Sequence, residues 1–297
     1  TVWDNITSKI RAYNGAKMSK YTNITDESAE AYMDAADVDY SETNVQVQGV
    51  DEADIVKTDG KYIYILKNEY KKDGTTLNSV IKIVNITGEK PVQCKSITIE
   101  GFCADDMYLG GKRLVIIGRE SALINYGKAL NDDIAFSENC SSAVFYDVSD
   151  PQEPEKITEC AQSGNLSDTR LIDGKLYIIS NYYINTEKIE KDKPETFVPS
   201  VTAKNHSGAV NAGSICFYGN CSEPEYTVLS AYDIKDGKLL STQSVLGGSY
   251  TVYASSKNII TASLSGGDGK LQVTRFSLNG GEITLEAAGE LEGELLN

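Results

Sequence analysis

The sequence predicts an all-β protein built from repeated antiparallel hairpins, and three observations lead to this prediction. From residue 44 onward, short runs of β-branched, aliphatic and aromatic residues are separated by turns, which is typical of strands. Tyrosine is abundant, with 18 residues against six phenylalanines and one tryptophan, and it favours strands with half-exposed faces. Four similar strands each follow a Gly-Lys or Ser-Lys pair, namely Gly60-Lys61, Gly111-Lys112, Gly174-Lys175 and Ser256-Lys257.

The N-terminal segment, residues 1–42, does not share this pattern. Residues 21–41 are acidic and rich in alanine, as solvated segments usually are. We expect residues 1–42 to form a stalk or to cover an edge of the β domain, which we place at residues 43–297. The first apolar residues are spaced by three or four and predict a short amphipathic helix: Val2, Ile6, Ile10 and Tyr13.

The β domain begins with a strong hairpin signal. Asp59-Gly60 lies between two β-rich runs, residues 54–58 and 62–66. This dipeptide suits the tight turn of a hairpin, because the turn needs a positive φ that glycine accepts. The same turn chemistry recurs downstream, so the hairpin is the repeated element of the domain.

Each unit supplies four antiparallel strands, because two further strands follow its hairpin. Repeated sheets of four antiparallel strands are typical of the blades of a β-propeller, and we predict that fold with about four blades present and a ring that is truncated here or completed elsewhere. A β-sandwich made of hairpins is the alternative. The third strands of the four units are SVIKIVNI, SAVFYDV, TVLSAYDI and LQVTRFSL. The expected blades span residues 51–100, 102–161, 166–246 and 248–289, with the start of a further blade at 290–297.

Two units carry long insertions between their second and third strands, at residues 119–141 and 181–225. Long connections without periodicity are uncommon in compact domains and are often functional. Chain direction alternates within a blade, so we expect both insertions on one face, where they present a protein- or glycan-binding surface. Alternatively, they cover the blades or pack against the N-terminal segment. The candidate residues of this binding face are Tyr126, Tyr182, Tyr183, His206 and Tyr218.

The run at residues 44–66 reads NVQVQGVDEADIVKTDGKYIYIL and resembles the opening signature of a family of secreted bacterial and archaeal proteins. That family has a β-propeller domain distantly related to WD repeats. Other segments suit the same family, namely ADDMYLGGKRLVIIG, DTRLIDGKLYIISN and FYDVSDPQEP. The resemblance implies an exported propeller, often anchored to a membrane, at the cell surface or in the cell envelope. It implies no established activity.

The net charge and the apolar runs of the sequence bear on its partners and its relation to a membrane. The formal charge of −15 disfavours nucleic acid, whose phosphates would be repelled. No apolar run approaches the roughly 20 residues of a membrane-spanning helix, and no signal peptide begins the sequence. If the protein is exported, we expect its targeting segment outside these residues, and a membrane anchor there is compatible with the family.

The sequence has six cysteines and no Cys-x-x-Cys, with a single histidine, so a zinc site of the usual kind is not predicted. Disulfides in an oxidising compartment are one interpretation and buried thiols are the other. Cys94 and Cys103 are expected at opposite ends of their strands and do not suit a bridge. The candidate pairs are Cys216 with Cys221, and Cys140 with Cys160.

Metal binding and catalysis have one candidate cluster each. Asp51, Glu52 and Asp54 could converge near the central channel and bind Ca²⁺, which prefers oxygen ligands. Alternatively, they cap turns and bind neighbouring blades. A catalytic triad would have to use His206, and no Gly-x-Ser-x-Gly accompanies a serine. We therefore expect a non-enzymatic binding module without a cofactor, apart from the calcium site; a calcium-dependent phosphate-ester hydrolase is the alternative.

Overall fold

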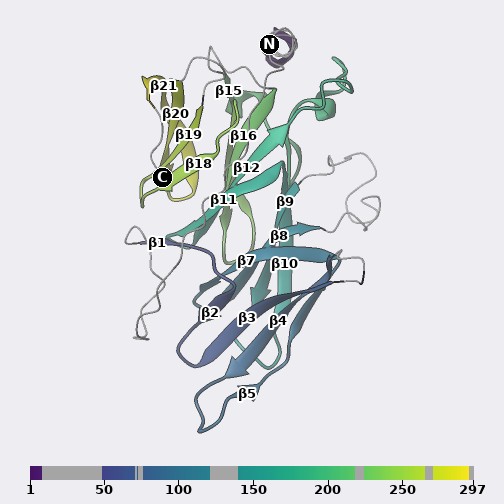
Figure 1. Cartoon of the computed structure of the whole chain (residues 1–297), viewed down its shortest axis with the longest axis vertical. Helices are drawn as coiled ribbons and strands as arrows, with labels where there is room; N and C mark the ends of the chain where they lie inside the picture. The colour runs from purple at the N-terminus through teal and green to yellow at the C-terminus, as the bar shows by residue number, and fades with distance from the viewer. Residues whose placement is uncertain are drawn as a thin grey trace, which may run out of the picture.

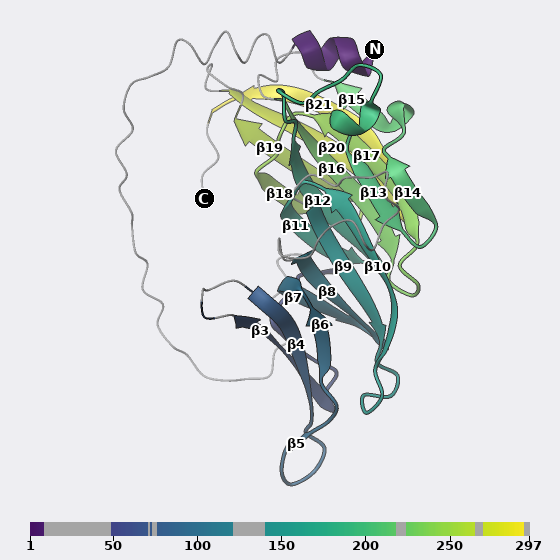
Figure 2. The same cartoon turned by 90° about the vertical axis from the view of Figure 1, so that its right-hand side faces the viewer.

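The computed structural model places four antiparallel sheets one after another along the molecule (Figure 1), and the all-β prediction is confirmed. The first sheet lies at one end of the long axis and the fourth sheet lies at the other. Seen from the side, the sheets form an open arc (Figure 2). The residues that the structure describes are 1–8, 49–70, 72, 76–120, 140–217, 224–264 and 270–293.

Each sheet is built around four or five strands of one sequence unit. The first sheet contains β2 (Val56–Thr58), β3 (Tyr62–Tyr70), β4 (Thr76–Asn85), β5 (Val92–Gln93) and β6 (Ile97–Glu100). The second contains β7 (Phe102–Gly110), β8 (Arg113–Glu120), β9 (Cys140–Asp147) and β10 (Glu155–Ser163). The third contains β11 (Asn165–Ile172), β12 (Lys175–Tyr183), β16 (Glu225–Asp233) and β17 (Leu239–Leu246). The fourth contains β18 (Thr251–Ala254), β19 (Asn258–Leu264), β20 (Lys270–Asn279) and β21 (Glu282–Glu292).

Apolar side chains fill the space between successive sheets. One cluster joins the first and second sheets and includes Tyr64 and Ile116, both fully buried. The largest cluster lies between the second and third sheets, and a further cluster, which includes Phe276, joins the third and fourth. The core thus lies between sheets that pack face to face, and burial of their apolar side chains stabilises the fold.

The insertion within the third unit adds strands to two sheets. Its hairpin, β13 (Ser200–Ala203) and β14 (His206–Ala209), extends the second sheet beyond β10. Its last strand, β15 (Ile215–Phe217), runs parallel to β17 at the edge of the third sheet. Two short 3-10 turns, Pro194–Thr196 and Ala212–Ser214, connect these strands. The insertion therefore closes the outer side of the boundary between the second and third sheets.

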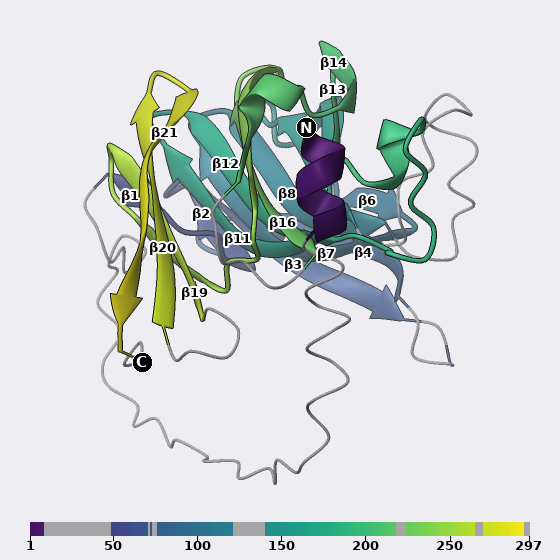
Figure 3. The same ribbon diagram turned by 90° about the horizontal axis from the view of Figure 1, so that it is seen from above.

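The N-terminal helix, residues 2–8, lies against this insertion (Figure 3). Ile6 is fully buried in the core cluster between the second and third sheets. The ring of Trp3 meets the ring of Phe197 edge to face, with centroids 5.2 Å apart. The helix and the insertion thus stabilise each other, which is the alternative that the sequence left open for both segments. No helix among the described residues has the length and apolarity to cross a membrane.

The structure corrects the expected C-terminal end. Residues 290–292 continue β21, in which Glu292 lies opposite Lys270, and do not begin a further blade. The apolar spacing at the end of the sequence resembles a new inner strand, but the pairing of β21 with β20 continues to Glu292.

Candidate functional site

The ends of several strands from the second and third sheets lie together on one side of the domain. In the second sheet, Cys140 at the start of β9 lies opposite Ser163 at the end of β10. In the third sheet, Asn165 at the start of β11 lies opposite Asn181 near the end of β12. The β8–β9 and β12–β16 connections therefore start from the same face, as the alternation of chain direction predicts. We call it the connection face.

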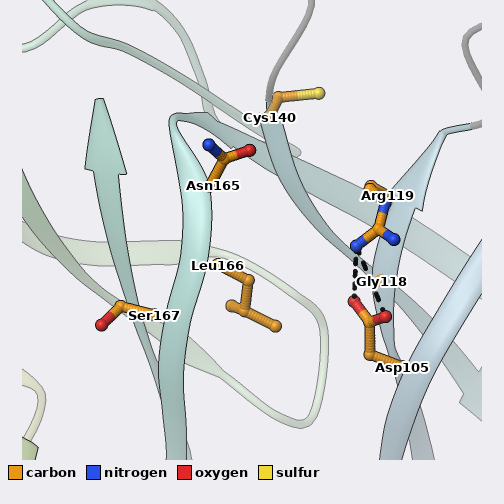
Figure 4. A pocket seen from close by; sticks show the side chains of 7 residues that line it. All are labelled: Asp105, Gly118, Arg119, Cys140, Asn165, Leu166 and Ser167. Carbon is orange, nitrogen blue, oxygen red and sulfur yellow. Dashed lines mark hydrogen bonds and ion pairs between the residues drawn. The ribbon is translucent and has the colours of Figure 1, made fainter. Parts of the chain in front are cut away.

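A pocket of about 410 Å³ opens between the second and third sheets on this face (Figure 4). Asp105 and Arg119 form an ion pair on its second-sheet side, with 3.4 Å between the guanidinium and the carboxylate. The backbone and side chains of the third sheet form the opposite wall. The lining residues are Asp105, Gly118, Arg119, Cys140, Asn165, Leu166 and Ser167.

Two β-bulges bring polar side chains to the pocket. In β7 the register shifts between Ala104 and Asp106, so that Asp105 is the extra residue. In β11 the register shifts between Leu166 and Asp168, so that Ser167 is the extra residue. A bulge re-aims the side chain that it inserts, and these two occupy corresponding positions on the first strands of adjacent sheets. The repeated bulge thus brings Asp105 and Ser167 to the two walls, and the Ser167 side chain points away from Asp105 and Arg119 (Figure 4).

The pocket keeps its shape through close backbone packing. A side chain at Gly118 would collide with the backbone of Cys103 and Ala104, so only glycine fits at that point of the wall. Across the pocket, the Ser167 hydroxyl donates to the Ser249 carbonyl oxygen at 3.3 Å. Both walls are therefore held by contacts within the domain.

The electrostatics of the pocket combine a carboxylate and a cation. Burial raises the pKa of Asp105 above its ordinary value, and the positive charge of Arg119 opposes this effect. The guanidinium side chain is 58% exposed, so it is accessible to a ligand while it contacts Asp105. The site can both donate and accept hydrogen bonds.

The predicted calcium ligands do not come together. The Lys57 ammonium donates to an Asp51 carboxylate oxygen at 3.1 Å and to the Glu52 backbone oxygen at 2.6 Å. The Asp54 carboxylate accepts from the backbone N–H of Val56 at 3.4 Å. Within the described ranges, no three His, Cys, Asp or Glu side chains group as metal ligands. These residues thus follow the alternative that they bind turns and neighbouring blades.

The same acidic stretch connects the inner strands of three sheets. Strand β1 (Val50–Asp51) pairs with β11 of the third sheet, and Asp54 exchanges two backbone hydrogen bonds with Met107 of the second. The chain then enters the first sheet through β2. The Lys57 ammonium lies 5.8 Å from the centre of the Tyr108 ring, whose hydroxyl is 2.9 Å from that of Thr169. A polar network therefore joins these sheets near their first strands.

The predicted binding-face residues separate into buried, exposed and undescribed ones. Tyr182 was expected on the surface, but it is 6% exposed and stacks on Tyr226 in the core, so that prediction is wrong. The next residue of β12, Tyr183, points to the opposite face of the sheet and is 47% exposed. His206 is exposed at the start of β14. Tyr126 and Tyr218 lie outside the described residues.

The predicted Cys140–Cys160 bridge is not formed. Cys160 lies opposite Ala143, three residues along β9 from Cys140, and the five described cysteines make no disulfide with one another. Complete burial raises the pKa of the Cys160 thiol well above its ordinary value. Cys221 lies outside the described residues, so the Cys216–Cys221 bridge stays a prediction.

Successive four-stranded sheets of this kind, which pack face to face in an open arc, define a β-propeller domain. A family model described as a beta propeller domain matches residues 40–297, and the chain belongs to that family. The expected resemblance and fold class are thereby confirmed.

The relatives that this chain is similar to are longer proteins. An uncharacterized protein of Methanocaldococcus jannaschii is 26% identical over 226 residues, which cover 74% of this chain and 28% of that protein. An uncharacterized protein of Archaeoglobus fulgidus is 29% identical over 147 residues, which cover 49% of this chain and 20% of that protein. The chain thus spans about a quarter of the length of these relatives.

The similarity to solved structures is weak. The acylaminoacyl peptidase of Pyrococcus horikoshii superposes with a TM-score of 0.42 and 11% identity, covering 79% of this chain and 32% of that one. An apocarotenoid oxygenase of Synechocystis reaches a TM-score of 0.34 and 13% identity, covering 80% and 49%. Similarity at this level carries no argument about activity.

Proposed function

We propose that this propeller is a non-enzymatic binding module of the cell envelope or extracellular space, and that the pocket on its connection face binds a glycan. The observation that carries the proposal is the pocket between the second and third sheets, whose lining includes charged and polar side chains. Its volume, about 410 Å³, is in the range of small-ligand sites and suits one or two sugar rings.

The chemistry of the walls supports a polyhydroxylated ligand. The Asp105 carboxylate accepts hydrogen bonds, the Arg119 guanidinium donates them, and the Asn165 amide does both. A sugar hydroxyl also donates and accepts, so it can be satisfied by any of these groups. Loops on a rigid scaffold commonly carry recognition, and two connections start beside this pocket.

The extracellular location is proposed on the family resemblance of residues 44–66. The described residues do not support a calcium-dependent hydrolase, because they offer no group of carboxylates around one point. A hydrolase of that kind needs several oxygen ligands at roughly 2.3–2.6 Å from the ion.

The test is a glycan array probed with the purified chain, followed by calorimetry on the glycan that binds. Arg119→Gln should weaken binding at least tenfold, which corresponds to about 1.4 kcal/mol. The matched control is Arg113→Gln, because Arg113 lies at the opposite end of the same strand and pairs with Asp147. That variant should bind as the wild type does.

Two results would overturn the proposal. The first is the absence of any glycan on the array that binds. The second is binding that Arg119→Gln leaves unchanged while circular dichroism shows that the variant is folded. Capture of a surface protein whose binding is lost in Arg119→Gln, without glycan binding, would assign the face to protein recognition instead.

A further inference from the structure

The Arg119 guanidinium in the pocket has unused hydrogen-bond donors. Only its Nη1 atom contacts Asp105, at 3.5 and 3.4 Å from the two carboxylate oxygens. Hydrogen bonds between a guanidinium and a carboxylate are usually about 2.7–2.9 Å long, and the most specific ones use two nitrogens in parallel. The Nε and Nη2 atoms of Arg119 make no hydrogen bond to any residue that the structure describes. Most of the donor capacity of this side chain is therefore available to a ligand.

Two other arginines show how this chain satisfies a guanidinium that stabilises the fold. Arg113 donates from Nε to a backbone carbonyl oxygen at 3.1 Å, and its Nη1 lies 2.7 Å from the Asp147 carboxylate. Arg170 is 15% exposed and donates both to the Asp168 carboxylate and to a backbone oxygen. Arg119 instead is 58% exposed, lines a cavity and makes a single long contact. Its position suits recognition of a ligand more than stabilisation of the fold.

The opposite wall supplies an apolar side chain and an amide. The Leu166 side chain points from the third sheet toward the Asp105–Arg119 pair (Figure 4), and it is partly buried against the core. Asn165 precedes it and is exposed at the start of β11. A sugar ring carries apolar C–H groups as well as hydroxyls. The wall can therefore contact the ring through Leu166 and a hydroxyl through Asn165.

We infer that the glycan is acidic, and that Arg119 binds the carboxylate of a uronic acid residue in it. This assignment rests on the proposed function and specifies its ligand class. A carboxylate presents two oxygens in one plane, which match two nitrogens on one edge of a guanidinium. The Nε and Nη2 atoms of Arg119 form such an edge, and a single hydroxyl cannot make this double contact.

The acidic character of the whole chain leaves the local electrostatics of the pocket in control. The net charge is −15, but charges further away than about 8 Å are largely screened at physiological ionic strength. Among the described lining residues, Asp105 and Arg119 are the charged ones. Asp105 is therefore the group that competes with a ligand carboxylate for the guanidinium. Burial raises the pKa of Asp105, so an uncharged residue should be tolerated at this position.

The test is calorimetry of the purified chain with matched probes. Trisaccharides of galacturonic acid and of glucuronic acid are each compared with the same trisaccharide after its carboxylates have been reduced to alcohols. The wild type should bind one of the acidic probes at least about tenfold more tightly than its reduced counterpart, because only the acid pairs with the cation. Arg119→Gln should abolish this preference. Asp105→Asn should strengthen binding of the acidic probe by about threefold or more, because it removes a like charge from the site.

Two control variants change the net charge by the same amounts away from the pocket. Arg275 is exposed in β20 of the fourth sheet, and Glu282 is exposed at the start of β21. Arg275→Gln and Glu282→Gln should bind the acidic probe as the wild type does. Circular dichroism checks that each variant is folded, and the comparison of the two probes on the wild type needs no variant.

Equal affinity of the wild type for the acidic and reduced probes would overturn the assignment. So would a preference for the acid that survives in folded Arg119→Gln, or weaker binding of the acid by folded Asp105→Asn. Binding of neutral glycans alone would leave the proposed function standing while it overturns the acidic ligand. A chain that binds no glycan of either kind would overturn the proposed function itself.

Discussion

The buried ammonium of Lys57 offers the most direct test of how the acidic stretch acts. Lys57 is 6% exposed, and its side chain contacts Asp51 and the Glu52 backbone, in a network that reaches Tyr108. The informative change is Asp51→Asn, which keeps the shape of the side chain and removes its charge. If the stretch holds the inner strands together through this ion pair, the folded protein should lose stability.

The expected magnitude follows from the geometry. A hydrogen bond to a charged group contributes about 1.5–3 kcal/mol to the free energy of unfolding. Asp51 is 30% exposed, so solvent screens part of the attraction, and the Glu52 oxygen at 2.6 Å still binds the ammonium in the variant. We therefore expect Asp51→Asn to lower the free energy of unfolding by about 2 kcal/mol.

A double-mutant cycle with Lys57→Met isolates the pair. Lys57→Met removes the buried cation, and the double variant should be less destabilised than the sum of the single variants by about 1–2 kcal/mol. Urea unfolding followed by circular dichroism gives these values, and thermal unfolding should show Tm lowered by about 3 °C in Asp51→Asn. Additive losses in the cycle, or an Asp51→Asn variant as stable as the wild type, would refute the reasoning.

The same samples test the predicted calcium site. If Asp51, Glu52 and Asp54 bound Ca²⁺, millimolar calcium would raise Tm of the wild type and chelation would reverse the rise. The lysine network instead predicts no response to either treatment. A calcium-dependent rise that Asp51→Asn abolishes would restore the metal site.

Three further outcomes follow from the packing and the titrating groups. Phe197→Ala should lower the free energy of unfolding by about 3–5 kcal/mol, because it leaves a cavity beside Trp3. Deletion of residues 188–212 should prevent folding. A soluble deletion variant that melts cooperatively would show that the insertion is dispensable. Burial and two neighbouring carboxylates raise the pKa of Asp106. The ionised form therefore costs stability at neutral pH, and this cost disappears as the pH falls through the raised pKa toward the ordinary value of 3.8. Asp106→Asn should thus be more stable than the wild type at pH 7 and lose that advantage near pH 4. A variant as stable as the wild type at both pH values would contradict this expectation. Cys160 should react with a thiol reagent only after denaturant unfolds the protein, and rapid labelling of the native protein would contradict its burial.

The repeated hairpins could be predicted because their turns leave a local signal. Gly60, Gly111 and Gly174 have φ values of 84°, 60° and 70°, in the region that glycine tolerates best. The strands after these turns begin within one or two residues of each glycine, at Tyr62, Arg113 and Lys175. Turn chemistry and strand composition point to the same structure, so the sequence was sufficient.

The candidate site could not be predicted in the same way. The bulges that expose Asp105 and Ser167 depend on the register of the paired strand, and register is a property of two segments far apart in the sequence. Two adjacent aspartates at 105 and 106 were visible, but only the pairing shows that the first of them is the extra residue.

The strands within the insertion at 181–225 could not be predicted for a related reason. Its prolines and glycines indicate a loop, yet the open edges of β10 and β17 accept its short strands. The turn of its hairpin is also fixed, because the Asn205 side chain exchanges two hydrogen bonds with the backbone of Leu239 in the third sheet. Tertiary contacts here override local propensity.

The path of residues 50–58 across three sheets constrains the order in which the protein folds. Val50 pairs with Ile172, which is 122 positions later in the chain (172 minus 50). During synthesis from the N-terminus, β1 must therefore wait until the third sheet emerges before it finds its partner. Pairing over such a distance closes a large loop and slows the final step, so the first sheet can form early as a hairpin but is secured late. Until then the intermediate exposes unpaired strand edges, and it is the state in which chaperones and proteases would act on this protein.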